Sequence, residues 1–163
     1  MPVAPQIAAA AAMFRQNGIF LPKSFEGMTG EEWNQRPNQT TNCMLWLVGH
    51  VAWARGRTLH FLGVEWSTPW LNEFARGRAC ADGSQSPSPE DLVAGWTEVS
   101  AVLTAALESA IAETLSAPPP EKAPPSTDGT LGGVISFLAY HETYHVGQAA
   151  YLSRWLGHAQ IMG

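Results

Sequence analysis

The sequence contains no run of basic residues, and its nine Lys and Arg face fourteen Asp and Glu, for a formal net charge of -5. A protein that binds nucleic acid through its phosphates needs clustered positive charge, so this balance argues against a nucleic-acid partner. The apolar N-terminal stretch has no basic segment before it, and Arg15 and Asn17 interrupt it before it could span a bilayer. The sequence therefore predicts a cytoplasmic protein that binds neither nucleic acid nor membrane.

Cysteine is also scarce, with only Cys43 and Cys80 in 163 residues. The two could form one bridge in an exported protein, but a single pair in a chain this long is no disulfide framework. We therefore expect two reduced thiols. A chain of this length can bury a core without such staples, and we expect one domain over residues 1–163.

No segment alternates apolar and polar residues with period two, whereas apolar residues recur at helical spacing in four long stretches. These stretches predict an all-α fold, a four-helix bundle. The first stretch contains Pro22, which is expected to kink or divide its helix. The second begins near Thr41 or Asn42, either of which is a plausible N-cap, and ends at Gly63.

Two connections rich in turn-forming residues separate the later helices. The one at residues 63–87 is far longer than neighbouring antiparallel helices need, so it could be a crossover that makes the flanking helices parallel. The third helix is expected to open with Ser88 as N-cap and Pro89 at its first position. The run APPPEKAPPSTDG cannot be helical, so the last helix should begin near Thr130 and stop at Gly157.

The last predicted helix contains HETYH, which fits the zinc-protease pattern H-E-x-x-H. Histidines four residues apart lie on one helical face, about 5 to 6 Å apart, so His141 and His145 can share one metal ion. The extended protease pattern would require Gly and His where this chain has Gln148 and Tyr151, and no Asp or Glu follows in residues 146–163. The protease interpretation is therefore disfavoured. The helical spacing also predicts which residues of this last helix face the core, namely Val134, Leu138, His141, His145, Gln148, Leu152 and Trp155.

A better third ligand lies upstream, on the second predicted helix. His50 is centred on the face that carries Trp46 and Trp53, so it can point at the core layer of the histidine pair. Three neutral imidazoles from two helices leave one metal position open, as in catalytic sites. His60 is too far along the helix from His50, and His158 lies beyond the end of the last helix. The alternative is that the core histidines form ordinary hydrogen bonds and bind no metal.

Three neighbouring residues are candidates for supporting roles. Glu142 would be the general base of a protease, but it is rotated about 100° from His141, and we expect a solvated or interhelical role. Gln148 could orient a ligand imidazole or a bound water, or else form a hydrogen bond between helices. Arg57 could meet an anionic substrate, although an arginine snorkelling near a helix end is common.

The segments WLVGHVAWARG in the second helix and HETYHVGQAAYLSRWLG in the last resemble the DinB-like (DNA-damage-inducible protein B, YfiT-related) metalloenzyme family. The resemblance covers essentially the whole chain, including the helix order and the long connection after the second helix. It implies a DinB/YfiT-like four-helix bundle, commonly a homodimer, with His50, His141 and His145 as metal ligands. It also implies a divalent transition metal, zinc or nickel before others, and a low-molecular-weight thiol.

The function implied by this resemblance is metal-dependent chemistry on a small molecule, of the thiol-dependent transferase or hydrolase type. Relatives include thiol-cofactor-dependent transferases and isomerases. The alternative is a non-catalytic helical bundle in which the metal is structural. Neither catalytic residues nor thiol-binding residues can be assigned from the sequence.

Overall fold

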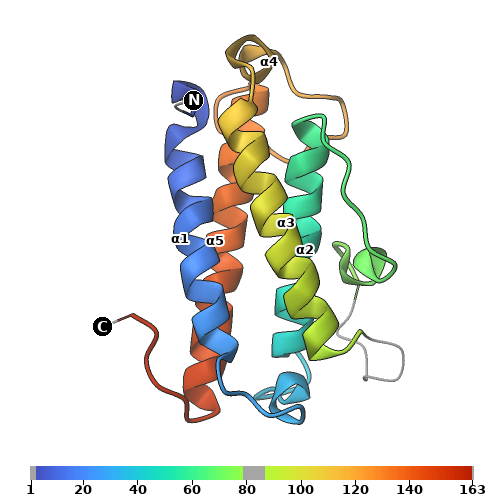
Figure 1. Ribbon diagram of the computed structural model, residues 1–163, viewed down its shortest axis with the longest axis vertical. Helices are drawn as coiled ribbons and strands as arrows, with labels where there is room; N and C mark the ends of the chain where they lie inside the picture. Colours follow the sequence, from blue (N-terminus) through green and yellow to red (C-terminus); the bar gives the residue numbers. More distant parts are fainter. Residues whose placement is uncertain (1–2, 79–86, 163) are drawn as a thin grey trace.

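The computed structural model describes residues 3–78 and 87–162. These residues form no strand, and the long helices pack as a bundle (Figure 1), which confirms the predicted all-α fold. The long helices are α1 (Ala8–Phe25), α2 (Met44–Phe61), α3 (Pro89–Ser109) and α5 (Leu131–Trp155). The shorter elements are α4 (Ala112–Ser116) and three 3-10 turns, η1 (Pro5–Ile7), η2 (Glu32–Asn34) and η3 (Leu71–Phe74).

The long helices pair by direction. Helices α1 and α5 run the same way along the bundle, and α2 and α3 run together in the opposite sense (Figure 1). The connection between α2 and α3 therefore crosses the length of the bundle, as its own length predicted. Contacts of α1 with α5, α5 with α2, α2 with α3, and α3 with α1 close the ring around one contiguous apolar core.

Capping residues stand at the predicted starts of two of the helices. At the start of α3, Ser88 Oγ accepts the Asp91 N–H at 3.1 Å, and the Asp91 carboxylate accepts the Ser88 N–H at 3.3 Å. At the start of α5, Thr130 Oγ1 accepts the Gly133 N–H at 3.1 Å. These bonds satisfy backbone donors that a helix leaves without intrahelical partners, which is why these sequences start helices here.

Several predicted details of the helices differ in the structure. Helix α1 is not divided at Pro22, because the proline lies in the last turns, where only one intrahelical bond is lost, and a kink at this residue stays a prediction. Helix α2 takes Cys43 as its N-cap instead of a preceding polar residue. Trp155, expected on the buried seam of the last helix, is 47% exposed.

Cys43 bears on the cellular compartment. It is fully buried and disulfide-bonded, so the expectation of a reduced thiol is wrong for this residue, whereas Cys80 lies outside the described residues. Disulfides are rare in the cytosol, so this bond weighs against the cytoplasmic location, which stays a prediction. None of the helices in the described ranges is long and apolar enough to cross a membrane.

Aromatic rings fix the crossover against the bundle by packing onto glycines. A Cβ at Gly49 of α2 would lie 2.4 Å from the ring of Phe74, and a Cβ at Gly95 of α3 would lie 2.6 Å from the ring of Trp70. Real Cβ atoms do not approach that closely, so each ring occupies space that only glycine leaves free. Turn η3, which contains Phe74, consequently lies directly on α2.

A buried ion pair ties the four long helices together. Arg55 of α2 donates to both carboxylate oxygens of Glu142 of α5, at 2.9 and 2.7 Å. The same guanidinium donates to Ser100 Oγ of α3 at 2.6 Å and to the Phe14 carbonyl of α1 at 3.0 Å. Its face lies 3.9 Å from the centre of the Trp96 ring, a cation–π contact. Every long helix therefore contributes at least one group to this cluster.

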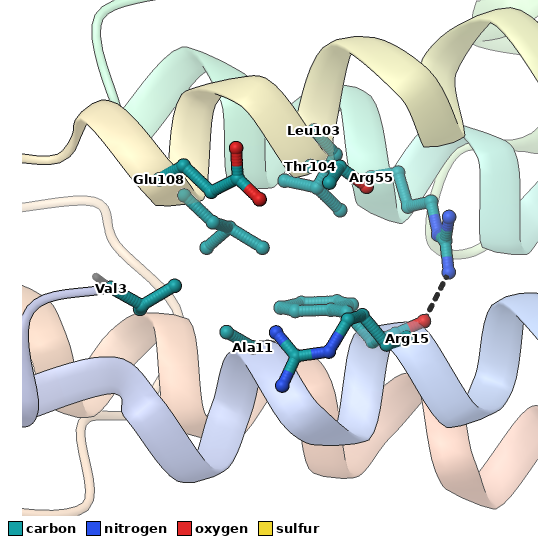
Figure 2. A pocket seen from close by; sticks show the side chains of 9 residues that line it. Val3, Ala11, Arg15, Arg55, Leu103, Thr104 and Glu108 are labelled. Carbon is teal, nitrogen blue, oxygen red and sulfur yellow. Dashed lines mark hydrogen bonds between the residues drawn. The ribbon is translucent and has the colours of Figure 1, made fainter. Parts of the chain in front are cut away.

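There is little room for water around the ion pair between Arg55 and Glu142. Burial raises the pKa of Glu142, because the ionised carboxylate loses its water, while the charge and the N–H donors of Arg55 oppose that rise. A cavity of about 10 Å³, lined by residues of α1 and α3 and by Arg55, has room for roughly one water molecule (Figure 2). The two charges therefore depend on each other for compensation.

Replacing Arg55 with Leu should lower the free energy of unfolding by about 3–5 kcal/mol, because Glu142 would stay buried without its counter-charge. Urea unfolding at neutral pH measures this loss. The double variant Arg55→Leu with Glu142→Leu removes both charges and should recover a large part of it. A single variant as stable as the parent, or a double variant with fully additive losses, would contradict the coupling.

Candidate metal centre

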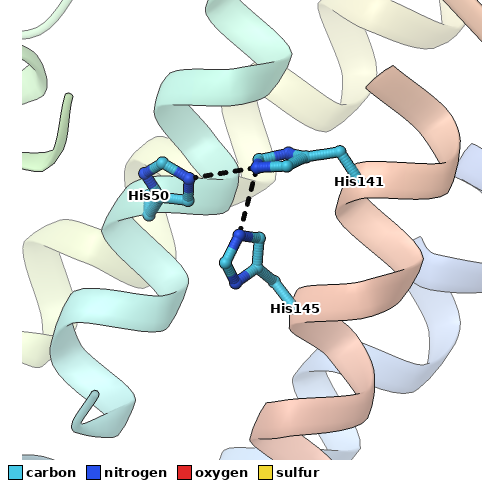
Figure 3. Close-up of side chains that lie close together, drawn as sticks. All are labelled: His50, His141 and His145. Atoms are coloured by element: carbon cyan, nitrogen blue, oxygen red, sulfur yellow. Dashed lines mark hydrogen bonds between the residues drawn. The ribbon is translucent and has the colours of Figure 1, made fainter. Parts of the chain in front are cut away.

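Three histidines from two helices meet in the core (Figure 3). Helix α2 supplies His50, and α5 supplies His141 and His145, one turn apart. The Nε2 atoms of His50 and His141 lie 3.4 Å apart, and those of His145 and His141 lie 3.1 Å apart. One ring nitrogen from each histidine lies within 4.8 Å of the others. The structure thus brings together the three residues that the sequence indicated.

Hydrogen bonds behind two of the rings determine which nitrogen carries the proton. His50 Nδ1 lies 2.7 Å from the Phe74 carbonyl oxygen, which can only accept, so Nδ1 is the protonated nitrogen. His145 Nδ1 donates in the same way to Gln148 Oε1 at 2.7 Å, and the Gln148 amide nitrogen donates to the Tyr144 hydroxyl at 3.0 Å. Both rings therefore present an Nε2 lone pair to the centre.

His141 is the less constrained ring. Its Nδ1 is buried and has no partner within the described ranges, while its Nε2 faces the other two histidines. A proton on this Nε2 could be donated to only one neighbour at a time, and two lone pairs would still face each other. A cation between the rings would satisfy all three nitrogens at once.

The spacing fits a transition-metal ion. Nitrogens at about 2.0–2.1 Å from a tetrahedral zinc ion stand roughly 3.3 Å from one another. The two measured separations, 3.1 and 3.4 Å, lie on either side of that value. An all-imidazole donor set suits zinc, nickel, iron or copper, whereas magnesium and calcium require oxygen ligands. The residues present therefore fit a divalent transition metal.

Aromatic side chains surround the imidazoles. Trp46 and Trp53, each about one turn from His50 on α2, stack on its ring at centroid distances of 4.4 and 5.4 Å. Phe137, one turn before His141 on α5, stacks on that histidine at 6.4 Å. These ring contacts limit the rotation of the imidazoles of His50 and His141.

Burial lowers the pKa of all three histidines, because the charged imidazolium would lose its hydration. It brings the pKa of both His50 and His141 to about 4. Nearby positive charge adds to the effect, from the other two histidines at His50 and from His145 and Arg76 at His141. At neutral pH the rings are therefore in the neutral form that binds metal.

The other candidates from the sequence lie elsewhere. His60 pairs with Glu65 at 3.1 Å beyond the end of α2, and His158 pairs with Glu32 at 3.1 Å. Arg57 lies over a phenylalanine ring of its own helix at 5.1 Å, as a packing role predicts. None of these side chains contributes a nitrogen to the histidine cluster.

Glu142 and Gln148 have roles that the sequence left open. Glu142 is turned away from the histidines toward Arg55, so its interhelical role is confirmed and its solvated role is wrong. Gln148 orients the ring of His145, the first of the two predicted alternatives. Sequence reasoning missed Arg55 and Phe74. A charged residue between Ala54 and Gly56 in the largely apolar α2 was a signal for the first, but a backbone carbonyl in a loop gives none.

A groove runs along α5 beside the centre. Residues of the segment 37–42 form one side, and Tyr144, Gly147, Gln148 and Tyr151 form the other. No histidine lines the groove, but Tyr144 and Gln148 belong both to it and to the hydrogen-bond network of His145. A molecule in the groove would therefore lie one hydrogen bond away from a candidate ligand.

An all-α bundle with a three-histidine cluster between its second and last long helices is compatible with metal binding. Residues 20–149 match the sequence profile of the DinB superfamily, and this range includes all three histidines. The chain belongs to the DinB superfamily. No curated protein matches it.

Replacing Gly49 with Ala should displace the Phe74 ring, which lies 2.4 Å from the position of the new Cβ, and weaken the bond to His50. Loss of such an outer hydrogen bond typically costs about 10–100-fold in metal affinity. Competition with a chromophoric chelator measures the affinity for zinc. The matched control is Gly147→Ala on α5, where a Cβ would meet nothing within 4 Å, so affinity should not change. Equal affinities of the two variants would contradict the role of Phe74.

Proposed function

We propose that this protein is a metal-dependent enzyme that acts on a small molecule, with zinc or nickel held by His50, His141 and His145. The observation that carries the proposal is the convergence of three Nε2 atoms while hydrogen bonds hold the protons of His50 and His145 on the opposite nitrogens. Three nitrogen ligands leave a four-coordinate ion one position for another ligand, which is the arrangement of catalytic sites.

The chemistry we propose is group transfer that depends on a low-molecular-weight thiol, or hydrolysis. A divalent ion in this site supplies Lewis-acid chemistry, lowering the pKa of a thiol or water ligand so that it is nucleophilic at neutral pH. The carbonyl of Phe74 and the amide of Gln148 keep two histidines in the tautomer that binds metal. The tryptophans on α2 stack on the ring of His50 and restrict its orientation.

A structural metal is the second candidate, because an ion bound by His50 and the α5 histidines would also fasten α2 to α5 in the core. The two functions differ in whether the bound ion can accept a further ligand. Cobalt makes that difference visible, because its absorption spectrum depends on the coordination sphere.

We also propose that the protein is a homodimer. Four aromatic residues of α5 are exposed and recur at intervals of four and seven residues, so they form one stripe along the helix. Aromatic side chains are enriched at protein interfaces, and a contiguous exposed patch of them marks an interaction surface. The stripe consists of Tyr140, Tyr144, Tyr151 and Trp155, which are 65, 57, 65 and 47% exposed.

Protein purified without a metal-affinity tag should contain about one divalent ion per chain by elemental analysis, since the three histidines form a single site. His50→Ala should lose most of the metal, whereas His60→Ala, which alters a histidine outside the centre, should keep it. A parent chain that stays empty after incubation with zinc or nickel would refute the site. So would full retention by the His50 variant.

The cobalt-substituted parent should change its absorption spectrum when 2-mercaptoethanol is added, because the fourth position accepts a thiolate. An unchanged spectrum would indicate a saturated ion and favour the structural alternative.

Tyr151→Glu should shift the protein from dimer to monomer in sedimentation velocity, because the charge would be buried in the proposed interface. Glu98→Gln, an exposed change on α3, is the control and should leave the dimer intact. A monomeric parent chain would contradict the proposal.

A further inference from the structure

The hydroxyl of Tyr144 connects the groove along α5 to the candidate metal centre. It accepts an N–H of the Gln148 amide at 3.0 Å, and the Gln148 amide oxygen accepts the proton of His145 Nδ1 at 2.7 Å. Tyr144 and Gln148 both line the groove, whereas His145 is one of the three candidate ligands. These three side chains therefore form a continuous hydrogen-bond chain from the groove to the centre.

This hydrogen-bond chain has a second arrangement, in which donors and acceptors are exchanged. If the Gln148 amide turns over, its nitrogen donates to His145 Nδ1 and its oxygen accepts the proton of the Tyr144 hydroxyl. His145 then carries its proton on Nε2, and it can donate that proton to His141 Nε2, which lies 3.1 Å away. Only the arrangement in the structure leaves the Nε2 lone pair of His145 free to bind a metal ion.

The two arrangements present different groups to the groove. In the observed one, the Tyr144 oxygen accepts from Gln148, so the hydroxyl proton is available for another acceptor. Among the residues that the structure describes, none accepts that proton. In the exchanged arrangement the proton is donated to Gln148, and the Tyr144 oxygen offers a lone pair instead. A molecule that presents an acceptor oxygen to Tyr144 therefore favours the arrangement that binds metal.

The groove has the size and the lining of a small-molecule site. Its volume is about 460 Å³, which is within the range of pockets that bind small ligands. Leu47 and Leu152 give it apolar surface, and Tyr144 and Tyr151 give it two aromatic rings. None of the described residues that line it is charged, so the groove has no counter-charge for an ionised ligand. The lining therefore matches an uncharged molecule.

The wall of the groove opposite α5 is held by its own hydrogen bonds. The side-chain oxygen of Asn38 accepts the backbone N–H groups of Thr40 and Thr41, at 2.9 and 3.1 Å. The hydroxyl of Thr41 donates back to the Asn38 carbonyl at 2.9 Å. The segment 37–42 thus has a defined shape, and a ligand in the groove would meet a preformed surface.

We infer that the groove binds an uncharged small molecule whose carbonyl or ether oxygen accepts the Tyr144 proton, and that this binding strengthens metal binding at the histidines. By thermodynamic reciprocity, a bound metal strengthens the binding of that molecule by the same factor. The inference rests on the proposed function and adds a neutral ligand beside the metal. The groove shares Tyr144 and Tyr151 with the proposed dimer surface, so this ligand would lie at the edge of that surface, against the segment 37–42.

The test uses N,N-dimethylbenzamide as the probe, because it has a carbonyl acceptor, an apolar ring and no hydrogen-bond donor. Competition with a chromophoric chelator measures the zinc affinity of the full chain with and without a saturating concentration of the probe. The parent should bind zinc about tenfold more tightly in the presence of the probe, a coupling of the usual size. Tyr144→Phe keeps the ring and removes the hydroxyl, so the probe should no longer change its zinc affinity.

Two further variants locate the effect. Tyr140→Phe is the matched control, because it removes the hydroxyl of an exposed tyrosine one turn earlier on α5 that does not line the groove, and it should keep the tenfold response. Gly147→Leu places a side chain in the groove, where a Cβ would meet nothing within 4 Å, and it should abolish the response by excluding the probe.

The inference is overturned if the zinc affinity of the parent does not respond to the probe. It is also overturned if Tyr144→Phe or Gly147→Leu keeps the full response, or if Tyr140→Phe loses it. These outcomes leave the proposed function intact, because the parent still binds zinc. A parent that binds no zinc at all refutes the proposed function, and the inference fails with it.

Discussion

The ion pair between Arg55 and Glu142 sets the relative position of the two helices that carry the histidines. Arg55 lies five residues after His50 on α2, and Glu142 directly follows His141 on α5. Sliding one helix by a single residue moves it about 1.5 Å, enough to break a contact in which two oxygens are held at 2.7 and 2.9 Å. Burying two charges contributes little net stability, so we interpret the pair as a device that fixes register. The convergence of the three Nε2 atoms depends on that register.

The groups behind the imidazoles have a common chemical character. A backbone carbonyl holds His50 and an amide oxygen holds His145, and both are neutral acceptors. A carboxylate in either position would make the ligand more basic and donate more negative charge toward a bound ion. Neutral acceptors would leave a bound ion more electrophilic, which is consistent with the proposed Lewis-acid chemistry.

The parts of the fold that could be predicted are those encoded by neighbouring residues. Ser88 caps α3 through its own local bonds, and the i, i+4 spacing places His141 and His145 on one face whatever else the chain does. Periodicity was also sufficient to point His50 at the same layer. Periodicity does not show where the neighbouring helices stop covering the apolar face of α5, so the burial of Trp155 was predicted wrongly.

The contacts that could not be predicted join segments that are far apart in the chain. Phe74 meets His50 through a main-chain atom 24 positions away, and such an atom has no sequence signature. The orientation of Glu142 depended on which helix packs beside that face of α5, and the helical pattern does not contain this information.

Phe74 makes two different contacts with α2. Its ring fills the space above Gly49, and its carbonyl oxygen accepts a hydrogen bond from the ring of His50. Attachment of the crossover and occupation of the proposed metal centre would therefore be linked equilibria. By thermodynamic reciprocity, the factor by which the attached crossover raises metal affinity equals the factor by which metal favours attachment. The backbone amides around Phe74 should thus exchange with solvent more slowly in the metal-loaded protein. Their exchange rates would then indicate whether the buried site is occupied.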